Sequence, residues 1–249
     1  MHLGGYVDPT HMTSRPLKLV RTTQPFLFQS GFVLHELPEK DMALLQHHSQ
    51  TESKKRGTVL FRQGGFPTGV YWLTSGKIKI CSTTKGGQRQ TLYIYSDGDL
   101  IAHRQMIAGE KHPVSAVLLE DSTFRFIPAE LFRSLLSNAP MFQRNMLTAL
   151  AKEFAVWTNR LTVFQNFPVK QRLLLALLVL NEQYSLSGMP EGQITITRTE
   201  LSEYVGASLE TIVRVLNQLK SNGLVQIQGR RITLSDPLSL VTLLEKEDT

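Results

Sequence analysis

The stretch TRTELSEYVGASLETIVRVLNQLKSNGLVQIQGRR, residues 197–231, decides the fold of this 249-residue chain. Thr197 and Glu200 have the T-x-x-E spacing of a capping box, in which each side chain satisfies an orphan amide of the first helical turn. Gly206 permits a sharp bend, and Ser208 is a good N-cap for a second helix. The stretch therefore predicts two helices joined by a tight turn.

The residues after this turn predict a recognition helix followed by a small β-hairpin. Ile212, Leu216 and Leu219 recur at i, i+4 and i+7, which is one buried helical face. Asn222-Gly223 ends the helix, and LVQI and RITL alternate as two strands around residues 228–230. Together these features predict a winged helix-turn-helix. The alternative is an αα-hairpin used only for packing, which would not require the wing.

The segment ITITRTELSEYVGASLETIVRVLNQLKSNGLVQIQGRRITL, residues 194–234, resembles the Crp/Fnr family of bacterial transcription regulators. Its E-T-x-x-R core, formed by Glu210, Thr211 and Arg214, is similar to the recognition helix of that family. The resemblance extends over roughly residues 36–240. It implies a DNA-binding homodimer whose sensor domain controls the placement of the two recognition helices.

The outward face of the second helix is expected to read DNA bases. Arginine presents two parallel donors that match guanine O6 and N7, and glutamate accepts from the cytosine amino group. The resembling family uses this Glu and Arg on a G·C pair of a T-G-A half-site. The residues expected to read bases are Leu209, Glu210, Val213 and Arg214. The residues expected to contact phosphates are Arg198, Ser208, Thr211, Arg230 and Arg231.

Composition sets wider bounds. Hydrophobic residues make up 41% and charged residues 19%, with no apolar run long enough for a membrane span and no export signal, so a cytoplasmic protein is expected. The single cysteine, Cys81, excludes an internal disulfide and a four-cysteine zinc or iron–sulfur site. Residues 1–165 hold 19 Lys and Arg against 12 Asp and Glu, whereas residues 166–249 hold 8 against 9. Net charge therefore gives no argument for DNA binding here.

The first half of the chain predicts a β-roll. Six short strands are expected between residues 58 and 127, bounded by turn residues. Gly64, Gly76, Gly87 and Gly98 lie 12, 11 and 11 residues apart, which suits the turns of a jelly-roll. The L-F-R-Q-G and G-x-Y-W-L-T-S-G segments resemble the cyclic-nucleotide-binding domain of Crp/Fnr proteins.

A long helix is expected between the two halves. Apolar residues at spacings of 3, 4, 3, 4 and 3 form a heptad seam, which is typical of a dimer interface. The seam consists of Leu147, Leu150, Phe154, Trp157, Leu161 and Phe164. A helix packed on its own barrel is the alternative, and the family resemblance favours the dimer.

The loop after Gly98-Asp99 is where the Crp branch of the family holds cAMP. Its Gly-Glu pair matches Ala102 and His103 here, and its arginine matches Val114, so cAMP binding in the usual manner is not expected. Another anion and haem ligated by a histidine stay open as alternatives, and no cofactor is predicted. The candidate effector pocket consists of Ala102, His103, Arg104, Val114, Ser115 and Trp157.

The sequence thus predicts an α+β protein with an N-terminal β-roll (jelly-roll, cyclic-nucleotide-binding-like) domain, a long dimerisation helix and a C-terminal winged helix-turn-helix. The expected divisions are a flexible leader (1–25), the sensor (26–138), the dimerisation helix (139–165), the DNA-binding domain (166–240) and an acidic tail (241–249). No catalytic or metal-binding motif occurs, so an enzyme is not expected. The expected partners are double-stranded DNA, a second copy of the chain and, for an activator, RNA polymerase. The rival hypothesis is a signalling module that dimerises or binds a protein without DNA.

Overall fold

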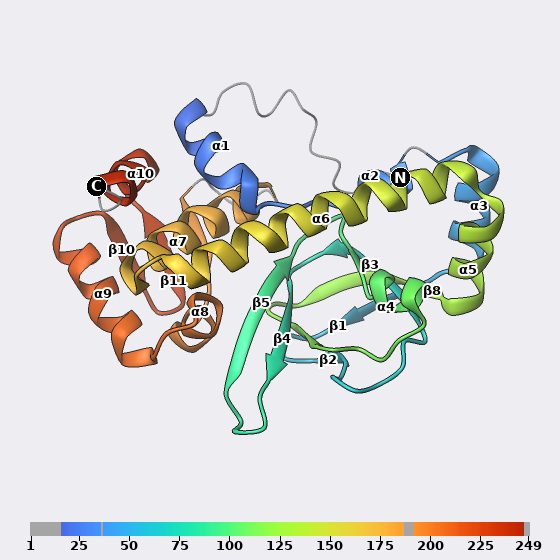
Figure 1. Cartoon of the computed structure of the whole chain (residues 1–249), viewed down its shortest axis with the longest axis horizontal. Coiled ribbons are helices and arrows are strands. Elements are labelled where there is room, and N and C mark those ends of the chain that lie inside the picture. The colour runs from blue at the N-terminus through green and yellow to red at the C-terminus, as the bar shows by residue number, and fades with distance from the viewer. Residues whose placement is uncertain (1–15, 36, 187–191, 247–249) are drawn as a thin grey trace. The chain divides into compact units, whose positions relative to one another are not determined.

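The computed structural model describes residues 16–35, 37–186 and 192–246. These residues form two compact units, and Figure 1 shows the chain coloured along its length. The first unit contains residues 29–154, and the second contains residues 16–28 together with residues 155–246. Helices and antiparallel sheets occur in both, which confirms the α+β class. No helix in the described ranges combines the length and the apolar character needed to cross a membrane.

In the described part of the first unit, two four-stranded antiparallel sheets are present, as the expected β-roll requires. One sheet has the order β1 (Gln50–Lys54), β8 (Ser122–Pro128), β3 (Gly69–Ser75) and β6 (Leu100–Ile101). The other has the order β2 (Val59–Phe61), β7 (Ser115–Leu118), β4 (Ile78–Thr83) and β5 (Arg89–Tyr95). All six strands predicted from sequence are present. The two missed strands, β1 and β6, are respectively polar and only two residues long, so neither carries an apolar alternation.

The core of the first unit lies between these sheets. Leu73 from β3, Ile78 from β4, Ala116 from β7 and Phe124 from β8 have no exposed surface. Strand β4 pairs with both β5 and β7, and with β5 it forms the long hairpin of Figure 1. Burial of these apolar side chains is the main stabilising contribution to this unit.

The described residues of the first unit also form the helices α2 (Phe32–His35), α3 (Glu39–His48), α4 (His103–Ala108), α5 (Ala129–Asn138) and the first part of α6 (Pro140–Asn166). Helix α4 was expected to be a loop. It begins after Ala102, whose φ is +75°, and ends at Gly109, whose φ is +69°. Six residues give too little periodicity for a helix to be predicted from sequence.

The second unit is a winged helix-turn-helix, as predicted. Its helices are the second part of α6, α7 (Val169–Leu186), α8 (Arg198–Val205), α9 (Leu209–Ser221) and α10 (Pro237–Lys246). Its sheet has the order β10 (Val225–Gln228), β11 (Arg231–Leu234) and β9 (Gln193–Thr195). The largely apolar α7 is buried along most of its length, which explains its run of leucines.

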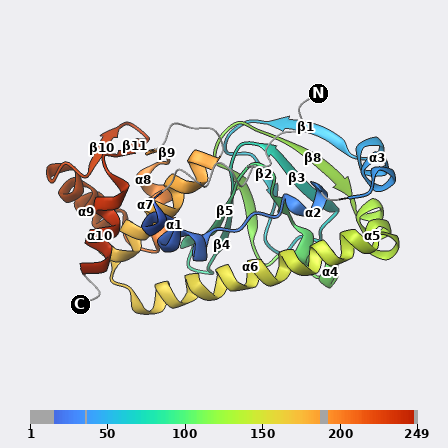
Figure 2. The ribbon, with the colours of Figure 1, turned by 90° about the horizontal axis from the view of Figure 1, so that it is seen from above.

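The first and the last described helices pack within the second unit. Helix α1 (Leu17–Thr23) is followed by η2 (Gln24–Phe26), and α1 lies against α7 and α10 in Figure 2. The Nζ atom of Lys18 is 2.7 Å from a carboxylate oxygen of Glu245.

The structure therefore differs from the expected leader and acidic tail. Residues 17–25 are helical, and residues 241–246 continue α10, where Val241 and Leu244 are buried. Short helices such as these depend on tertiary packing, which the local sequence does not reveal. Residues 1–15 and 247–249 of those predicted segments lie outside the described residues.

Candidate nucleic-acid interface

Helix α8 begins at the predicted capping box. The amide of Glu200 donates to Thr197 Oγ1 over 3.1 Å, and the amide of Thr197 donates to Glu200 Oε2 over 2.9 Å. The helix ends at Gly206, whose φ of +68° is disfavoured for residues with a Cβ atom. The amide of Gly206 donates to the Ser202 carbonyl over 2.9 Å. These bonds define the first helix and the turn.

Helix α9 begins with the predicted Ser208 cap, because the amide of Thr211 donates to Ser208 Oγ over 3.2 Å. Its inward face is buried against the unit. The buried side chains of this face are Ile212, Val215, Leu216 and Leu219. Asn222 and Gly223, with a φ of +72° at Gly223, end the helix as predicted.

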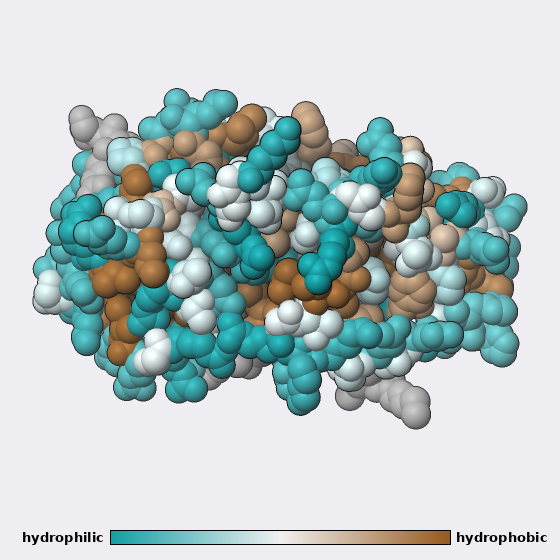
Figure 3. Space-filling model, turned by 90° about the horizontal axis from the view of Figure 1, so that it is seen from below, coloured by the Kyte–Doolittle hydropathy of each residue, from teal (hydrophilic) through white to brown (hydrophobic). Residues whose placement is uncertain are grey.

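The opposite face of α9 is uncovered. Leu209 and Val213 are 46% and 37% exposed, and with Glu210, Arg214 and Asn217 they line a shallow surface hollow. Figure 3 shows apolar residues at the surface among hydrophilic ones. Within the described part of the chain, none of these five side chains has a hydrogen bond or ion pair. All four residues predicted to read bases therefore share one open face.

The predicted phosphate contacts lie at three places in the same unit. Ser208 and Thr211 cap α9, and their hydroxyl oxygens are 2.8 Å apart. Arg230 and Arg231 are exposed at the tip of the wing, where β10 turns into β11. Arg198 opens α8 and is half-buried, and burial lowers the pKa of its guanidinium.

Helix α6 carries two apolar stripes. One faces its own units and includes Phe142, Met146, Ala149, Val156 and Val163, all of them buried.

The second stripe of α6 is the predicted seam. Leu147, Phe154 and Leu161 are 69%, 72% and 58% exposed, which is unusual for large apolar side chains seven residues apart. Leu150, Trp157 and Phe164 are half-buried.

The segment after Gly98 is closed by its own side chains. His103 is buried, with Nδ1 3.1 Å from the Leu100 carbonyl and Nε2 3.2 Å from Glu153 Oε2. Tyr95 Oη donates to Glu153 Oε1 over 2.5 Å, and Arg104 Nε lies 3.6 Å from Glu153 Oε2. Burial alone would raise the pKa of Glu153, but the bonds and charges of His103, Arg104 and Tyr95 lower it to about 2.

The other candidate pocket residues have different surroundings. Ala102 and Val114 are buried, Ser115 Oγ accepts from the amide of Gln63 over 2.9 Å, and Trp157 belongs to the second unit. Sequence reasoning missed Tyr95 and Glu153 as partners of His103, since they are remote in the chain and carry no local motif. In the described ranges, no cluster of three or more His, Cys, Asp or Glu could hold a metal ion.

Two family models match this chain. Residues 51–139 match the cyclic nucleotide-binding domain, and residues 171–243 match the Crp-like helix-turn-helix domain. Together they cover more than half of the sequence. The chain belongs to the Crp/Fnr family of transcription regulators. Like the proteins that it resembles, this Crp/Fnr regulator is not an enzyme.

Individual relatives agree with the family. The transcriptional activator protein Anr of Pseudomonas protegens is 27% identical over 191 residues, covering 76% of this chain and 78% of Anr. The anaerobic regulatory protein of Pasteurella multocida is 27% identical over 191 residues, covering 76% of this chain and 70% of the relative.

Solved structures share the fold of this Crp/Fnr regulator. The c-di-GMP-responsive global regulator CLP of Xanthomonas campestris has a TM-score of 0.69 at 22% identity, covering 80% of this chain and 100% of CLP. FixK2 from Bradyrhizobium japonicum has a TM-score of 0.70 at 19% identity, covering 78% of this chain and 96% of FixK2.

Proposed function

We propose that this regulator binds a palindromic DNA site as a homodimer and reads each half-site with the outward face of α9. The open face formed by Leu209, Glu210, Val213, Arg214 and Asn217 carries this proposal. Such a helix suits a major groove, because one of its faces is buried and the exposed face carries both cationic and anionic side chains.

Arg214 is the expected reader of guanine, and Glu210 is the expected acceptor for the paired cytosine. The two are i and i+4 on α9, close to its N-terminus, so both can reach base edges. Val213, between them, can meet a thymine methyl group. Arg230 and Arg231 of the wing, with Ser208 and Thr211, would fix the register by contacts to phosphates.

The seam of α6 supports the homodimer. Leu147, Phe154 and Leu161 present an apolar stripe whose heptad spacing fits a second copy of the same helix. Two copies related by a twofold axis would present two α9 helices to a palindrome with half-sites about one helical turn apart. We expect the protein to act in the cytoplasm, with RNA polymerase as a further partner if it activates transcription.

The proposed sensor does not bind cAMP in the usual manner of the family. His103 occupies the position where the Crp branch has its ribose-binding glutamate, and its side chain is committed to Glu153 and Leu100. Val114 replaces the phosphate-binding arginine. Calorimetry should detect no cAMP binding at physiological concentration, and micromolar affinity would contradict this part of the proposal. An effector of another chemical class stays open.

Selection of bound fragments from random DNA tests the proposed function. We expect the full-length protein to enrich a palindrome with a G·C pair in each half-site. Recovery of unrelated fragments at the frequency of the starting pool would contradict sequence-specific binding.

A further inference from the structure

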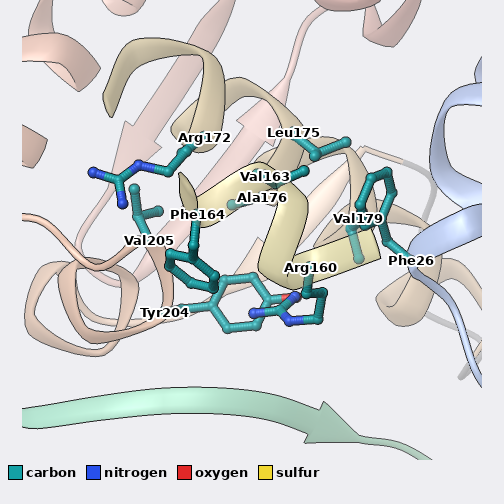
Figure 4. A pocket seen from close by; sticks show the side chains of 10 residues that line it. All are labelled: Phe26, Arg160, Val163, Phe164, Arg172, Leu175, Ala176, Val179, Tyr204 and Val205. Atoms are coloured by element: carbon teal, nitrogen blue, oxygen red, sulfur yellow. The ribbon is translucent and has the colours of Figure 1, made fainter. Parts of the chain in front are cut away.

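The second unit contains a small cavity beside the turn between α8 and α9. Figure 4 shows Arg160 and Phe164 from α6, Arg172 from α7 and Tyr204 and Val205 from α8 around it. Its volume is about 30 Å³, which is enough for a water or two and too small for an organic effector. The contacts along its wall are therefore of more interest than the space itself.

Arg160 makes a directed contact to the end of α8. Its Nη1 donates to Tyr204 Oη over 2.7 Å, and its guanidinium carbon lies 4.5 Å from the centre of the Tyr204 ring. Arg160 is 8% and Tyr204 2% exposed, so this charge-assisted bond is shielded from water. Tyr204 is the last residue but one of α8.

Phe164, one turn further along α6, contacts the turn itself. A Cβ atom placed on Gly206 would lie only 2.9 Å from Phe164 Cε1. The ring of Phe164 is held between two guanidinium groups, since those of Arg160 and Arg172 lie 5.8 Å and 5.7 Å from its centre. The left-handed Gly206 therefore allows both the bend and the close approach of Phe164.

Only Ala207 and Ser208 separate Gly206 from the start of α9. The amides of Gly206 and Ala207 both donate to the Ser202 carbonyl, which ties the turn to α8. A small rotation of this turn would change the direction of α9 and displace its outward side chains from base edges. Contacts that fix the turn thus fix the reading face.

We propose that Arg160 and Phe164 are positioning residues for DNA readout, acting from α6 through Tyr204 and Gly206 on the direction of α9. We call the contact of Arg160 with Tyr204 and the contact of Phe164 with Gly206 the turn contacts. The proposal rests on the proposed function of α9. Packing alone gives no reason for a buried arginine, because an apolar side chain of similar volume often stabilises a protein as well or better. A hydrogen bond, unlike apolar packing, depends on direction, so it can hold one orientation of the turn.

A pair of tyrosine variants separates positioning from stability. Tyr204→Phe removes the hydroxyl that accepts from Arg160 and leaves the ring in place. Tyr184→Phe is the matched control, because Tyr184 is equally buried in the same unit but donates to the Thr195 carbonyl in β9. Arg160→Met should reproduce the effect of Tyr204→Phe.

The first readout is amide hydrogen exchange of the full-length protein without DNA. We expect Tyr204→Phe to speed exchange at Gly206, Ala207 and Thr211 about tenfold, the effect of losing roughly one hydrogen bond's net free energy. Tyr184→Phe should leave these three amides unchanged. Equal exchange at the turn in both variants would overturn the proposal.

The second readout is the ratio of affinities for a selected site and for random DNA. Tyr204→Phe should lower this ratio several-fold while Tyr184→Phe preserves it, whatever the two variants do to the melting temperature. An unchanged ratio for Tyr204→Phe would overturn the positioning role. A wild-type protein without any sequence preference would instead contradict the proposed function of α9, and the exchange measurement would still decide whether the turn contacts hold the turn.

A double-mutant cycle tests the second contact. Gly206→Ala is strained by its backbone angle and by Phe164, and Phe164→Leu can relieve only the steric part. The backbone strain is common to both backgrounds and cancels in the cycle. We expect Gly206→Ala to reduce the affinity ratio less in the Phe164→Leu background than in the wild type. Strictly additive effects would remove Phe164 from the proposal.

Discussion

The outward face of α9 and the segment from Asp99 to Arg104 both carry charged residues that sequence reasoning linked to ligands, but their surroundings are opposite. In the described part of the chain, Glu210 and Arg214 have no polar partner, and their neighbours Leu209 and Val213 are exposed. His103 is instead buried and bonded to Glu153. The comparison separates a polar residue whose hydrogen bonds are made within its own chain from an exposed set that is accessible to a partner.

The seam of α6 is exposed like the outward face of α9. Disrupting it should have the largest effect on assembly and DNA binding. Phe154→Asp would place a charge in the proposed desolvated interface between two copies, at a cost of several kcal/mol. We expect a monomer in sedimentation experiments and weak DNA binding.

The matched control for the seam is Ala155→Asp, because Ala155 is exposed on the same helix but lies outside the heptad positions. It should leave the dimer intact. A Phe154→Asp protein that still sediments as a dimer would remove the seam from the account.

The buried bond between His103 and Glu153 should affect the pH dependence of the free energy of unfolding. The folded pKa of Glu153, about 2, lies below its ordinary value of 4.5. Its ionised form therefore stabilises the fold above pH 4.5, and this contribution, about 3 kcal/mol at most, is lost as the pH falls from 4.5 towards 2. Unfolding titrations should show this loss in the wild type and not in Glu153→Gln. Identical acid profiles would mean that the bonds to His103 and Tyr95 contribute nothing.

Asp99 titrates in the opposite sense within the same unit. Its burial raises its pKa to about 7, although the amides of Ser96 and Ser30 and the Ser30 hydroxyl all donate to it and lower the pKa. Protonation of Asp99 therefore stabilises the fold fully below pH 3.8, and this contribution is lost as the pH rises towards 7. The same titrations on Asp99→Asn should lack this second change.

On the open side, Arg214→Ala should weaken binding to the selected site by roughly 1–3 kcal/mol, the usual worth of a bidentate contact to guanine. Fluorescence titration of the wild type and the variant measures this loss. Arg230→Ala, at the wing, is the control and should weaken selected and random DNA alike. Equal losses on both kinds of DNA for Arg214→Ala would place it among the phosphate contacts.

The sequence predicted correctly those features that depend on residues close together in the chain. The capping box of Thr197 and Glu200, the bend at Gly206 and the cap at Ser208 are short-range patterns, and all were predicted correctly. The packing of α1 against α10 and the bond of His103 to Glu153 join residues far apart in the chain. Such contacts depend on tertiary packing, and no residue spacing in the sequence predicts them.

The smallest expected effect concerns Ala102, the one non-glycine residue with positive φ among those described. The left-handed conformation disfavours its Cβ atom by about 1–2 kcal/mol, which the greater freedom of glycine in the unfolded chain partly offsets. Ala102→Gly should therefore stabilise the protein by up to about 1 kcal/mol in thermal unfolding. Ala116→Gly, in strand β7, is the control and should destabilise it. A lower melting temperature for Ala102→Gly would show that its Cβ is needed for packing.

The central claim is that the open face of α9 reads sequence, and a selection from random DNA with Arg214→Ala tests it most directly. The wild type should enrich a palindrome with one guanine per half-site that depends on Arg214, and the variant should lose preference at that guanine while keeping the palindrome and its spacing. If the variant enriched the same sequences with the same preference at every position, α9 would not be the reader.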